Sequence, residues 1–208
     1  MKKHLAKKYR TVVIGASAGG LAALATILSR LPEEFEPSII IVQHIKEDDA
    51  DDYRSIFYNK KCALPVKEAT DKEPLQQGTV YLAPASYHLL VERNGSNLSL
   101  SVDEPVNYSR PSIDVLFESA ALAFEDKLIG IILTGANNDG SEGIRKIKEN
   151  GGYTMVQDPE EADAEAMPLA AIKATEIDQI LRLSDIGDSL AAMGITKNKK
   201  PQKTLRVQ

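Results

Sequence analysis

The chain of 208 residues is long enough to bury one core and does not require a second domain. Its composition, 43% hydrophobic and 26% charged, is that of an ordinary globular protein and excludes the disordered and fibrous classes. The net charge of −5, with no basic cluster on the part expected to fold, argues against a nucleic-acid partner.

The single cysteine, Cys62, has no partner for a disulfide within the chain, which favours a reducing compartment, and we expect the cytoplasm. No apolar run approaches the ~18 residues of a membrane-spanning helix, and the basic start lacks the apolar stretch and cleavage site of an export signal. We expect no membrane insertion. We also expect a basic extension over residues 1–9 and a basic, solvated tail over residues 195–208.

Buried strands and amphipathic helices alternate along the chain. Short apolar, largely β-branched runs predict strands at residues 11–15, 38–44, 127–135 and 153–157. Helical spacing of apolar residues predicts helices at 20–31, 112–124 and 140–152. This alternation predicts one α/β domain over residues 10–194, a doubly wound, mainly parallel sheet with helices on both faces.

The middle of the chain departs from this alternation. Residues 78–85 and 88–102 are typical of short strands, and the second stretch contains the turn "RNGSN". We therefore expect a small antiparallel hairpin excursion. The acidic run "KEDDADD" at residues 46–52 lacks the spacing of a calcium loop, so a solvated loop or helix start explains it better than a metal site.

Ser17 lies in the turn "GASAGG" between the first strand and the first helix, and three roles compete for it. A dinucleotide-binding turn would need glycine at Ser17 and an acidic residue where the second strand ends in Gln43 and His44, although another phosphate ligand stays open. Ser17 could instead cap the helix. The pattern G-x-S-x-G over residues 15–19 is also typical of a nucleophile exposed on a sharp turn.

His44 and Asp139 favour the nucleophile. Both follow predicted strands, and the carboxyl ends of parallel strands share one edge of a sheet, so Ser17, His44 and Asp139 can converge there as nucleophile, base and orienting acid. Taken singly, His44 could be a structural histidine at a strand end whose hydrogen bonds are satisfied, and Asp139 could be a turn residue. His4, near the terminus, and His88, in the hairpin excursion, are less well placed. The chain order Ser, His, Asp excludes the α/β-hydrolase fold.

Six motifs in residues 10–194 carry a resemblance to a known family: "VIGASAGG", "IIIVQH", "YLAPASYH", "SRPSIDVLF", "GIILTGANNDGSEG" and "AMPLAAI". With them the sequence resembles the catalytic domain of the chemotaxis protein-glutamate methylesterases (CheB-type). The resemblance implies hydrolysis of glutamate γ-methyl esters on the cytoplasmic helices of chemoreceptors, glutamine deamidation at the same site, and no cofactor or metal. It assigns the nucleophile to Ser17, the base to His44 and the carboxylate to Asp139.

Backbone amides of Ala18 and Ala136 are the expected oxyanion donors. The chain departs from the family pattern there, where threonine or serine and methionine are usual, and after His44, where "HIKEDDADDY" replaces H-M-P-x-x-F-T. Arg110 and Asp114 are read either as substrate-binding charges or as an i,i+4 pair at a helix start, and they stay outside the catalytic set.

No receiver domain precedes the turn at Ser17, so we expect a stand-alone catalytic domain. Three alternatives follow for its control: no regulation, control by a receiver-domain protein in trans, or a role outside receptor adaptation. Two other functions remain open, a non-catalytic signalling module of the same fold and a small-molecule carboxylesterase.

Overall fold

The structure is a computed structural model that describes residues 9–44 and 53–195. Its strands are β1 (Thr11–Ala16), β2 (Ser38–Gln43), β3 (Val66–Glu68), β4 (Val80–Leu82), β5 (His88–Val91), β6 (Leu98–Ser101), β7 (Leu128–Ile132), β8 (Tyr153–Gln157) and β9 (Gln179–Leu181). Its helices are α1 (Gly20–Leu28), α2 (Tyr53–Asn59), α3 (Ile113–Phe124), α4 (Ser141–Glu149), α5 (Ala166–Ala174) and α6 (Leu183–Gly194), with one 3-10 turn at Glu125–Lys127.

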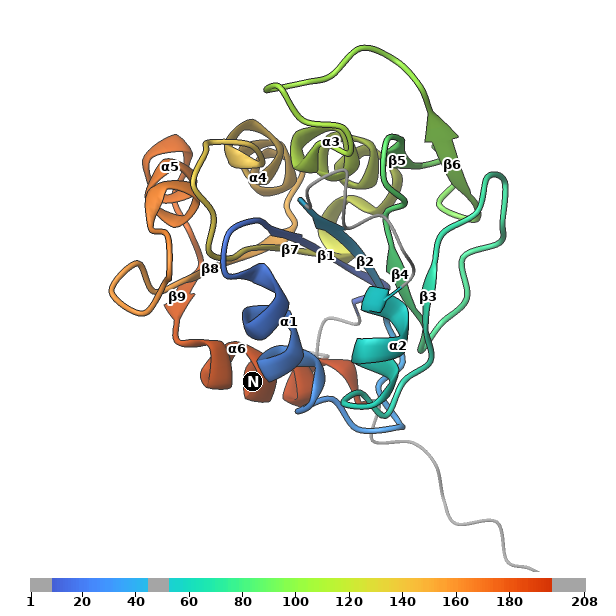
Figure 1. The fold of residues 1–208 in the computed structure, drawn as a ribbon, viewed down its shortest axis with the longest axis horizontal. Helices are drawn as coiled ribbons and strands as arrows, with labels where there is room; N and C mark the ends of the chain where they lie inside the picture. Colours follow the sequence, from blue (N-terminus) through green and yellow to red (C-terminus); the bar gives the residue numbers. More distant parts are fainter. Residues whose placement is uncertain (1–8, 45–52, 196–208) are drawn as a thin grey trace, which may run out of the picture.

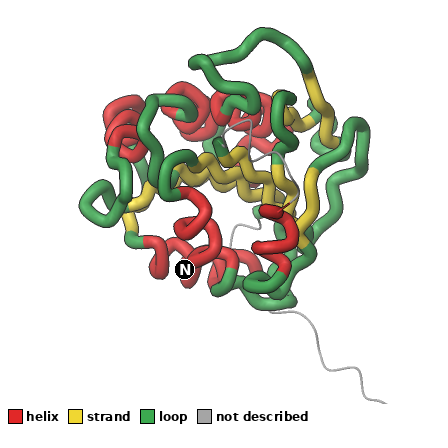
Figure 2. The backbone as a smooth tube through the Cα atoms, in the orientation of Figure 1, coloured by secondary structure: helices red, strands yellow, loops and turns green. Residues whose placement is uncertain are grey.

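A seven-stranded sheet forms the middle layer, in the order β3-β4-β2-β1-β7-β8-β9, and every pair in it is parallel. Helices α1, α2 and α6 lie on one face, and α3, α4 and α5 lie on the other (Figure 1). The strands therefore form a layer between two layers of helices (Figure 2). The predicted doubly wound α/β fold is confirmed.

The alternation of side chains along β1 explains the two cores. Val12 and Ile14 pack in the cluster that contains α1 and α6, whereas Val13 packs in the cluster that contains α3, α4 and α5. A strand points successive side chains to opposite faces, so a strand buried on both faces must be apolar throughout. All six residues of β1 are buried, which is why the run reads as continuously apolar.

The middle of the chain differs from the prediction in one respect. The antiparallel hairpin is present as β5 and β6, which pair from His88 with Ser101 to Val91 with Leu98. Residues 80–82, however, form β4 and pair in parallel with β2 and β3 in the main sheet. The reason is that this stretch is buried on both faces, which a small surface excursion could not provide.

The strand order reverses beside β1. The chain passes from β1 to β2 on one side, and it later returns to β7 on the other side of β1. In open parallel sheets such a reversal leaves a crevice outside the carboxyl ends of the strands. The ends of β2, β1 and β7 therefore provide three neighbouring positions for a site.

Three predictions fall on residues outside the described ranges: the basic extension over most of residues 1–9, the acidic run at 46–52, and nearly all of the tail at 195–208. Within residues 9–44 and 53–195, no helix combines the length and the apolar character needed to cross a membrane.

Candidate active site

The turn that carries Ser17 is held against the loop that follows β7. The Ser17 amide donates to Thr134 O at 2.9 Å, and Thr134 Oγ1 donates to Ala18 O at 2.8 Å. A methyl group on Gly135 would lie 2.9 Å from Ser17 Cβ, so only glycine lets the loop after β7 approach the serine this closely. Helix α1 begins one turn later, with Gly19 at the N-cap in the left-handed region (φ 77°).

The N-terminus of α1 decides one of the three roles considered for Ser17. No side chain forms a capping hydrogen bond there, and the Gly20 amide bonds to the backbone oxygen of Ser17 rather than to its hydroxyl. Ser17 is therefore not a side-chain cap of α1. Ser17 lies half-buried at the carboxyl end of β1.

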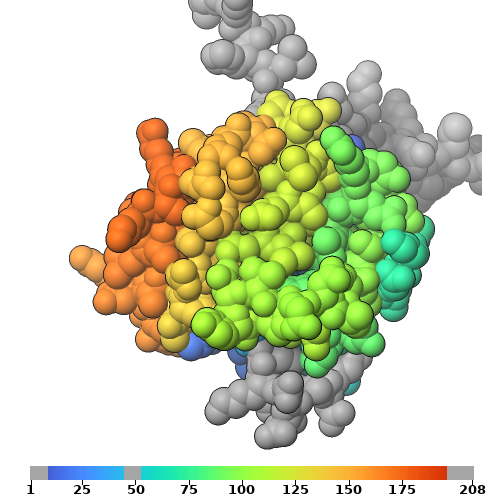
Figure 3. Space-filling model, turned by 90° about the horizontal axis from the view of Figure 1, so that it is seen from above, coloured from blue at the N-terminus to red at the C-terminus, as the bar shows by residue number. Residues whose placement is uncertain are grey.

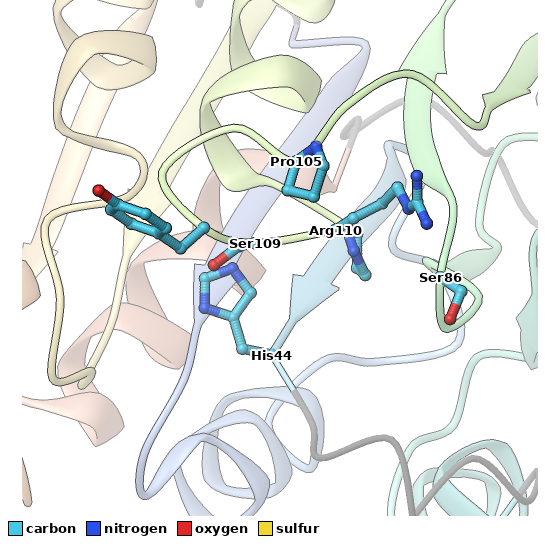
Figure 4. A pocket seen from close by; sticks show the side chains of 7 residues that line it. His44, Ser86, Pro105, Ser109 and Arg110 are labelled. Atoms are coloured by element: carbon cyan, nitrogen blue, oxygen red, sulfur yellow. The ribbon is translucent and has the colours of Figure 1, made fainter.

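His44 lies directly beside this turn. Ala16 and Gln43, the last residues of β1 and β2, pair across the sheet, and the His44 amide donates to Ala16 O at 2.9 Å. Ser17 and His44 are thus the next residues on two paired strands. The His44 side chain is 13% exposed, and its imidazole points toward Ser109 (Figure 4).

Asp139 lies in the loop after β7 and accepts hydrogen bonds from several directions. Its Oδ2 lies 2.9 Å from His44 Nε2 and 2.7 Å from the Ile113 amide. Its Oδ1 accepts from Ser112 Oγ at 2.8 Å, from Asn107 Nδ2 at 3.1 Å and from the Asp114 amide at 3.2 Å. The side chain is fully buried, so these donors take the place of water.

The same donors decide the charge of Asp139. Burial raises the pKa of its carboxyl group, but the hydrogen bonds from His44, Ile113, Asn107 and Ser112 together outweigh burial and hold the pKa below its ordinary value. Asp139 is therefore an acceptor, and His44 must present an N–H to it from Nε2. In neutral His44 the lone pair then lies on Nδ1, which faces Asn137 Nδ2 at 3.5 Å.

Asp114, in the first turn of α3, is the second buried carboxyl group beside the site. It accepts from the Gly143 amide at 2.7 Å and from Asn107 Nδ2 at 2.7 Å. Burial raises its pKa to about 6, against these hydrogen bonds and with a further contribution from the charge of Asp139. Asp139 thus accepts amides at the start of α3, the helix that carries Asp114, and Asp114 accepts an amide in the first turn of α4, the helix that follows Asp139.

The two expected oxyanion donors are free to bind a ligand. Among the bonds between described residues, neither the Ala18 nor the Ala136 amide has an acceptor, and both residues are exposed. Ala18 directly follows Ser17, and Ala136 follows Gly135, which lies against Ser17. Both amides therefore belong to segments that adjoin the serine.

A pocket of about 260 Å³ opens beside His44. We use the term strap for residues 102–111, which connect β6 to α3 and form most of its wall; Figure 4 shows Pro105, Ser109 and Arg110 above His44, with Ser86 at the side. Tyr108 also lines it and is fully exposed. The strap and α3 to α5 lie next to one another in the view from above (Figure 3).

The structure brings His44 and Asp139 into direct contact and places Ser17 next to them. No hydrogen bond from Ser17 Oγ occurs among residues 9–44 and 53–195, and His44 Nδ1 bonds to Asn137 instead. Catalytic hydrogen bonds often form only in the substrate complex, so a serine–histidine pair does not require this hydrogen bond in the free protein.

The sequence did not reveal Asn107, Ser112 or the structural role of Asp114. Ser112 and Asp114 adjoin Asp139 only through the fold, although their place at the start of a predicted helix could have suggested amide and carboxylate contacts. Arg110 forms no i,i+4 pair with Asp114; its Nη1 donates to Val102 O and Asp103 O, within the strap.

The fold and the site together define a class: an α/β protein with a serine, a histidine and an aspartate beyond the carboxyl ends of three adjacent parallel strands. Comparison with known proteins is more specific. The family described as CheB methylesterase matches residues 12–190. A Leptospira interrogans relative, named as a protein-glutamate methylesterase/protein-glutamine glutaminase, is 51% identical over 181 residues, which cover 86% of this chain and 92% of the relative.

A Carboxydothermus hydrogenoformans protein-glutamate methylesterase/protein-glutamine glutaminase is 41% identical, and the match covers 87% of this chain but only 54% of that protein. The solved catalytic domain of Thermotoga maritima CheB methylesterase has a TM-score of 0.85 at 32% identity, over 89% of this chain and 99% of that domain. This chain belongs to the CheB methylesterase family.

Proposed function

We propose that this chain is a hydrolase that cleaves γ-methyl esters of glutamate side chains in chemoreceptor proteins and deamidates glutamine at the same site. The observation that carries the proposal is the contact of 2.9 Å between His44 Nε2 and Asp139 Oδ2, beside Ser17, in a member of the CheB methylesterase family. The names of the Leptospira and Carboxydothermus relatives support both reactions. We further propose that it works in the cytoplasm on the methylated cytoplasmic helices of receptors.

In the proposed reaction, Ser17 Oγ attacks the ester carbonyl carbon and its proton passes to His44 Nδ1. Asp139 accepts the Nε2 hydrogen, so it fixes the tautomer that leaves Nδ1 free and stabilises the imidazolium that forms. The carbonyl oxygen becomes an oxyanion, which the Ala18 and Ala136 amides bind. Because Asn137 Nδ2 now faces Nδ1, it must yield to the Ser17 hydroxyl when substrate binds.

Collapse of this intermediate breaks the bond to the methoxy oxygen, and His44 returns the proton so that methanol leaves. Water then attacks the acyl group on Ser17, and His44 takes a proton from that water. The bond between the acyl carbon and Ser17 Oγ breaks, His44 returns the proton to Ser17 Oγ, and the product is a glutamate carboxylate. Glutamine deamidation follows the same steps with ammonia as the leaving group. The pocket of about 260 Å³ beside His44 has room for a side chain presented by a larger partner.

The experiment measures methanol release from a methylated receptor cytoplasmic fragment, with a small aryl ester assayed in parallel. We expect methanol from the receptor fragment, and we expect unmethylated fragment to compete with it poorly. Turnover of the small ester alone, uninhibited by the methylated fragment, would instead assign the site to a small-molecule carboxylesterase. No turnover of either substrate by folded protein would contradict the proposed hydrolase.

A further inference from the structure

The strap over the pocket is anchored at its tip. Val106 and Ser109 exchange two backbone hydrogen bonds, and the two residues between them, Asn107 and Tyr108, both have positive φ, 52° and 59°. This is the pattern of a two-residue turn of the I′ type, in which asparagine is favoured. A tyrosine in the left-handed region is rare, and residues held in such conformations cluster at functional sites.

The side chain of Asn107 points back from this turn to the two carboxylates. Its Nδ2 donates to Asp114 Oδ2 at 2.7 Å and to Asp139 Oδ1 at 3.1 Å. The other donors to Asp139 come from His44 and from residues 112–114 at the start of α3. Asn107 is therefore the residue through which the strap contacts the Asp139 carboxylate, which in turn contacts His44.

We propose that Asn107 is a positioning residue that holds the Asp139 carboxylate in place for His44 by donating to Asp139 and Asp114 at once. The proposal rests on the proposed function, in which Asp139 orients His44. Two carboxylates in a dry environment repel each other, and a shared N–H donor between them relieves that repulsion without adding charge. Burial is the main cause of the raised pKa of Asp114, and the charge of Asp139 raises it further, whereas the hydrogen bond from Asn107 lowers it.

The charged groups near His44 define what a variant at position 107 would change. Asp139 contacts the imidazole directly. Asp114 lies on α3 next to Asp139, and Glu118 follows one turn later on the same helix. Arg110 lines the same pocket as His44. Buried His88 on β5 reaches the site only indirectly, because its Nδ1 accepts from the amide of Ser112. A new carboxylate at position 107 would therefore adjoin the two existing ones and stabilise a charged His44.

Two variants separate the side-chain hydrogen bonds from the shape of the turn. Asn107→Gly deletes the amide and suits the positive φ, so it leaves the turn unstrained. Asn107→Asp keeps the shape, replaces the donor with an acceptor and adds one negative charge. Asn94→Gly and Asn94→Asp are matched controls, since Asn94 lies in the turn between β5 and β6, at the opposite end of β5 from His88.

The first readout is the titration of the His44 imidazole, followed by NMR in protein without substrate, with the His44→Gln variant identifying its signal among the three histidines. We expect the midpoint of His44 in Asn107→Asp to move upward by about one pH unit. We expect a smaller move, downward, in Asn107→Gly, because a carboxylate that is no longer held against the imidazole stabilises its charged form less. We expect no move in the Asn94 variants. An unmoved midpoint in Asn107→Gly overturns the proposal, and if that variant does not fold, an unmoved midpoint in Asn107→Asp does so.

The second readout is kinetic. In Asn107→Gly we expect kcat for methanol release to fall by about tenfold to a hundredfold. A mutation that displaces the catalytic base lowers the rate even when the mutated residue itself does not touch the reacting bond. KM should change by a smaller factor. A changed KM with kcat and the His44 midpoint both unaltered would show that Asn107 only holds the strap. Since the titration needs no substrate, it decides on Asn107 even if wild-type protein releases no methanol.

Discussion

At the scale of single residues, Asp139 combines two tasks that are usually separate. Its Oδ2 faces His44 Nε2, and both its oxygens accept amides from the start of α3. Ser17 is the opposite case, because its hydroxyl forms no hydrogen bond within the described residues, so its loss removes no hydrogen bond among them. A change at Asp139 should therefore affect both rate and stability, whereas a change at Ser17 should affect rate alone.

Asp139→Asn tests the first half of this contrast. An asparagine amide would present a hydrogen to His44 and favour the wrong tautomer, so we expect kcat to fall about 10⁴-fold. The loss of one acceptor oxygen for buried donors should also lower the free energy of unfolding by about 1–3 kcal/mol. Kinetics and urea unfolding measure both effects. Asp188→Asn, on the exposed face of α6, is the control, and equal effects of the two variants would contradict the dual role.

Asp114 predicts an unusual pH dependence of stability. Its pKa rises from the ordinary 3.8 to about 6, mainly by burial, so between these values the folded protein holds a proton that the unfolded chain releases. The free energy of unfolding should therefore fall as pH rises from about 4 to 6, by about 3 kcal/mol from this group, and stay level above. Asp139, with its lowered pKa, acts oppositely and stabilises the fold above pH 3.8.

The measurement is urea unfolding of wild type and Asp114→Asn at intervals from pH 4 to pH 8. The variant cannot ionise at this position, so we expect the fall between pH 4 and 6 to be reduced in it. An identical pH dependence in both proteins would mean that Asp114 does not titrate in this range.

At the scale of elements, the site depends on the close approach of α3 and α4. Gly143 lies in the first turn of α4, and a methyl group there would stand 2.5 Å from Phe117 Cβ and 3.2 Å from Asp114 Cα. The lack of a side chain allows the Gly143 amide to reach the Asp114 carboxylate. The two helices are thus close at their first turns, where backbone amides of α3 donate to Asp139 and a backbone amide of α4 donates to Asp114.

Gly143→Ala should force these helices apart. Because both sides of the contact are backbone or Cβ atoms that cannot turn away, we expect a loss of about 1–3 kcal/mol in the free energy of unfolding. Activity should fall as well, since Asp139 accepts amides of the displaced helix. Denaturant unfolding checks the first effect, with Ser141→Ala on the same helix as the control. A Gly143→Ala protein as stable as the control would contradict the close packing.

Some of these elements could be predicted from sequence and others could not. The strands β1, β2, β7 and β8 and the helices α1, α3 and α4 were predicted because long apolar runs or regular helical spacing mark them. The edge strands β3 and β9 are three residues long and only partly buried, so their pattern is too short to detect. The helices α2, α5 and α6 were not predicted; α5, for instance, contains Pro168 near its start.

At the scale of the whole molecule, the parallel sheet explains why three residues far apart in the sequence could be predicted to lie together. Once Ser17 and His44 end adjacent parallel strands and Asp139 follows a third, the topology places them at one edge whatever the loops do. The contacts of Asn107 could not be foreseen, because they join the strap to residues 7 and 32 positions away through an irregular turn. Sequence patterns therefore predict the ends of buried strands well and the contacts of irregular loops poorly.

The most direct test of the account is methanol release from a methylated receptor fragment by Ser17→Ala, beside wild type and Ser29→Ala at the other end of α1. We predict that Ser17→Ala loses at least about 10³-fold in rate while it unfolds at the same urea concentration as wild type, and that Ser29→Ala retains its activity. Methanol release by Ser17→Ala at a rate close to that of wild type would contradict the assignment of Ser17 as the nucleophile.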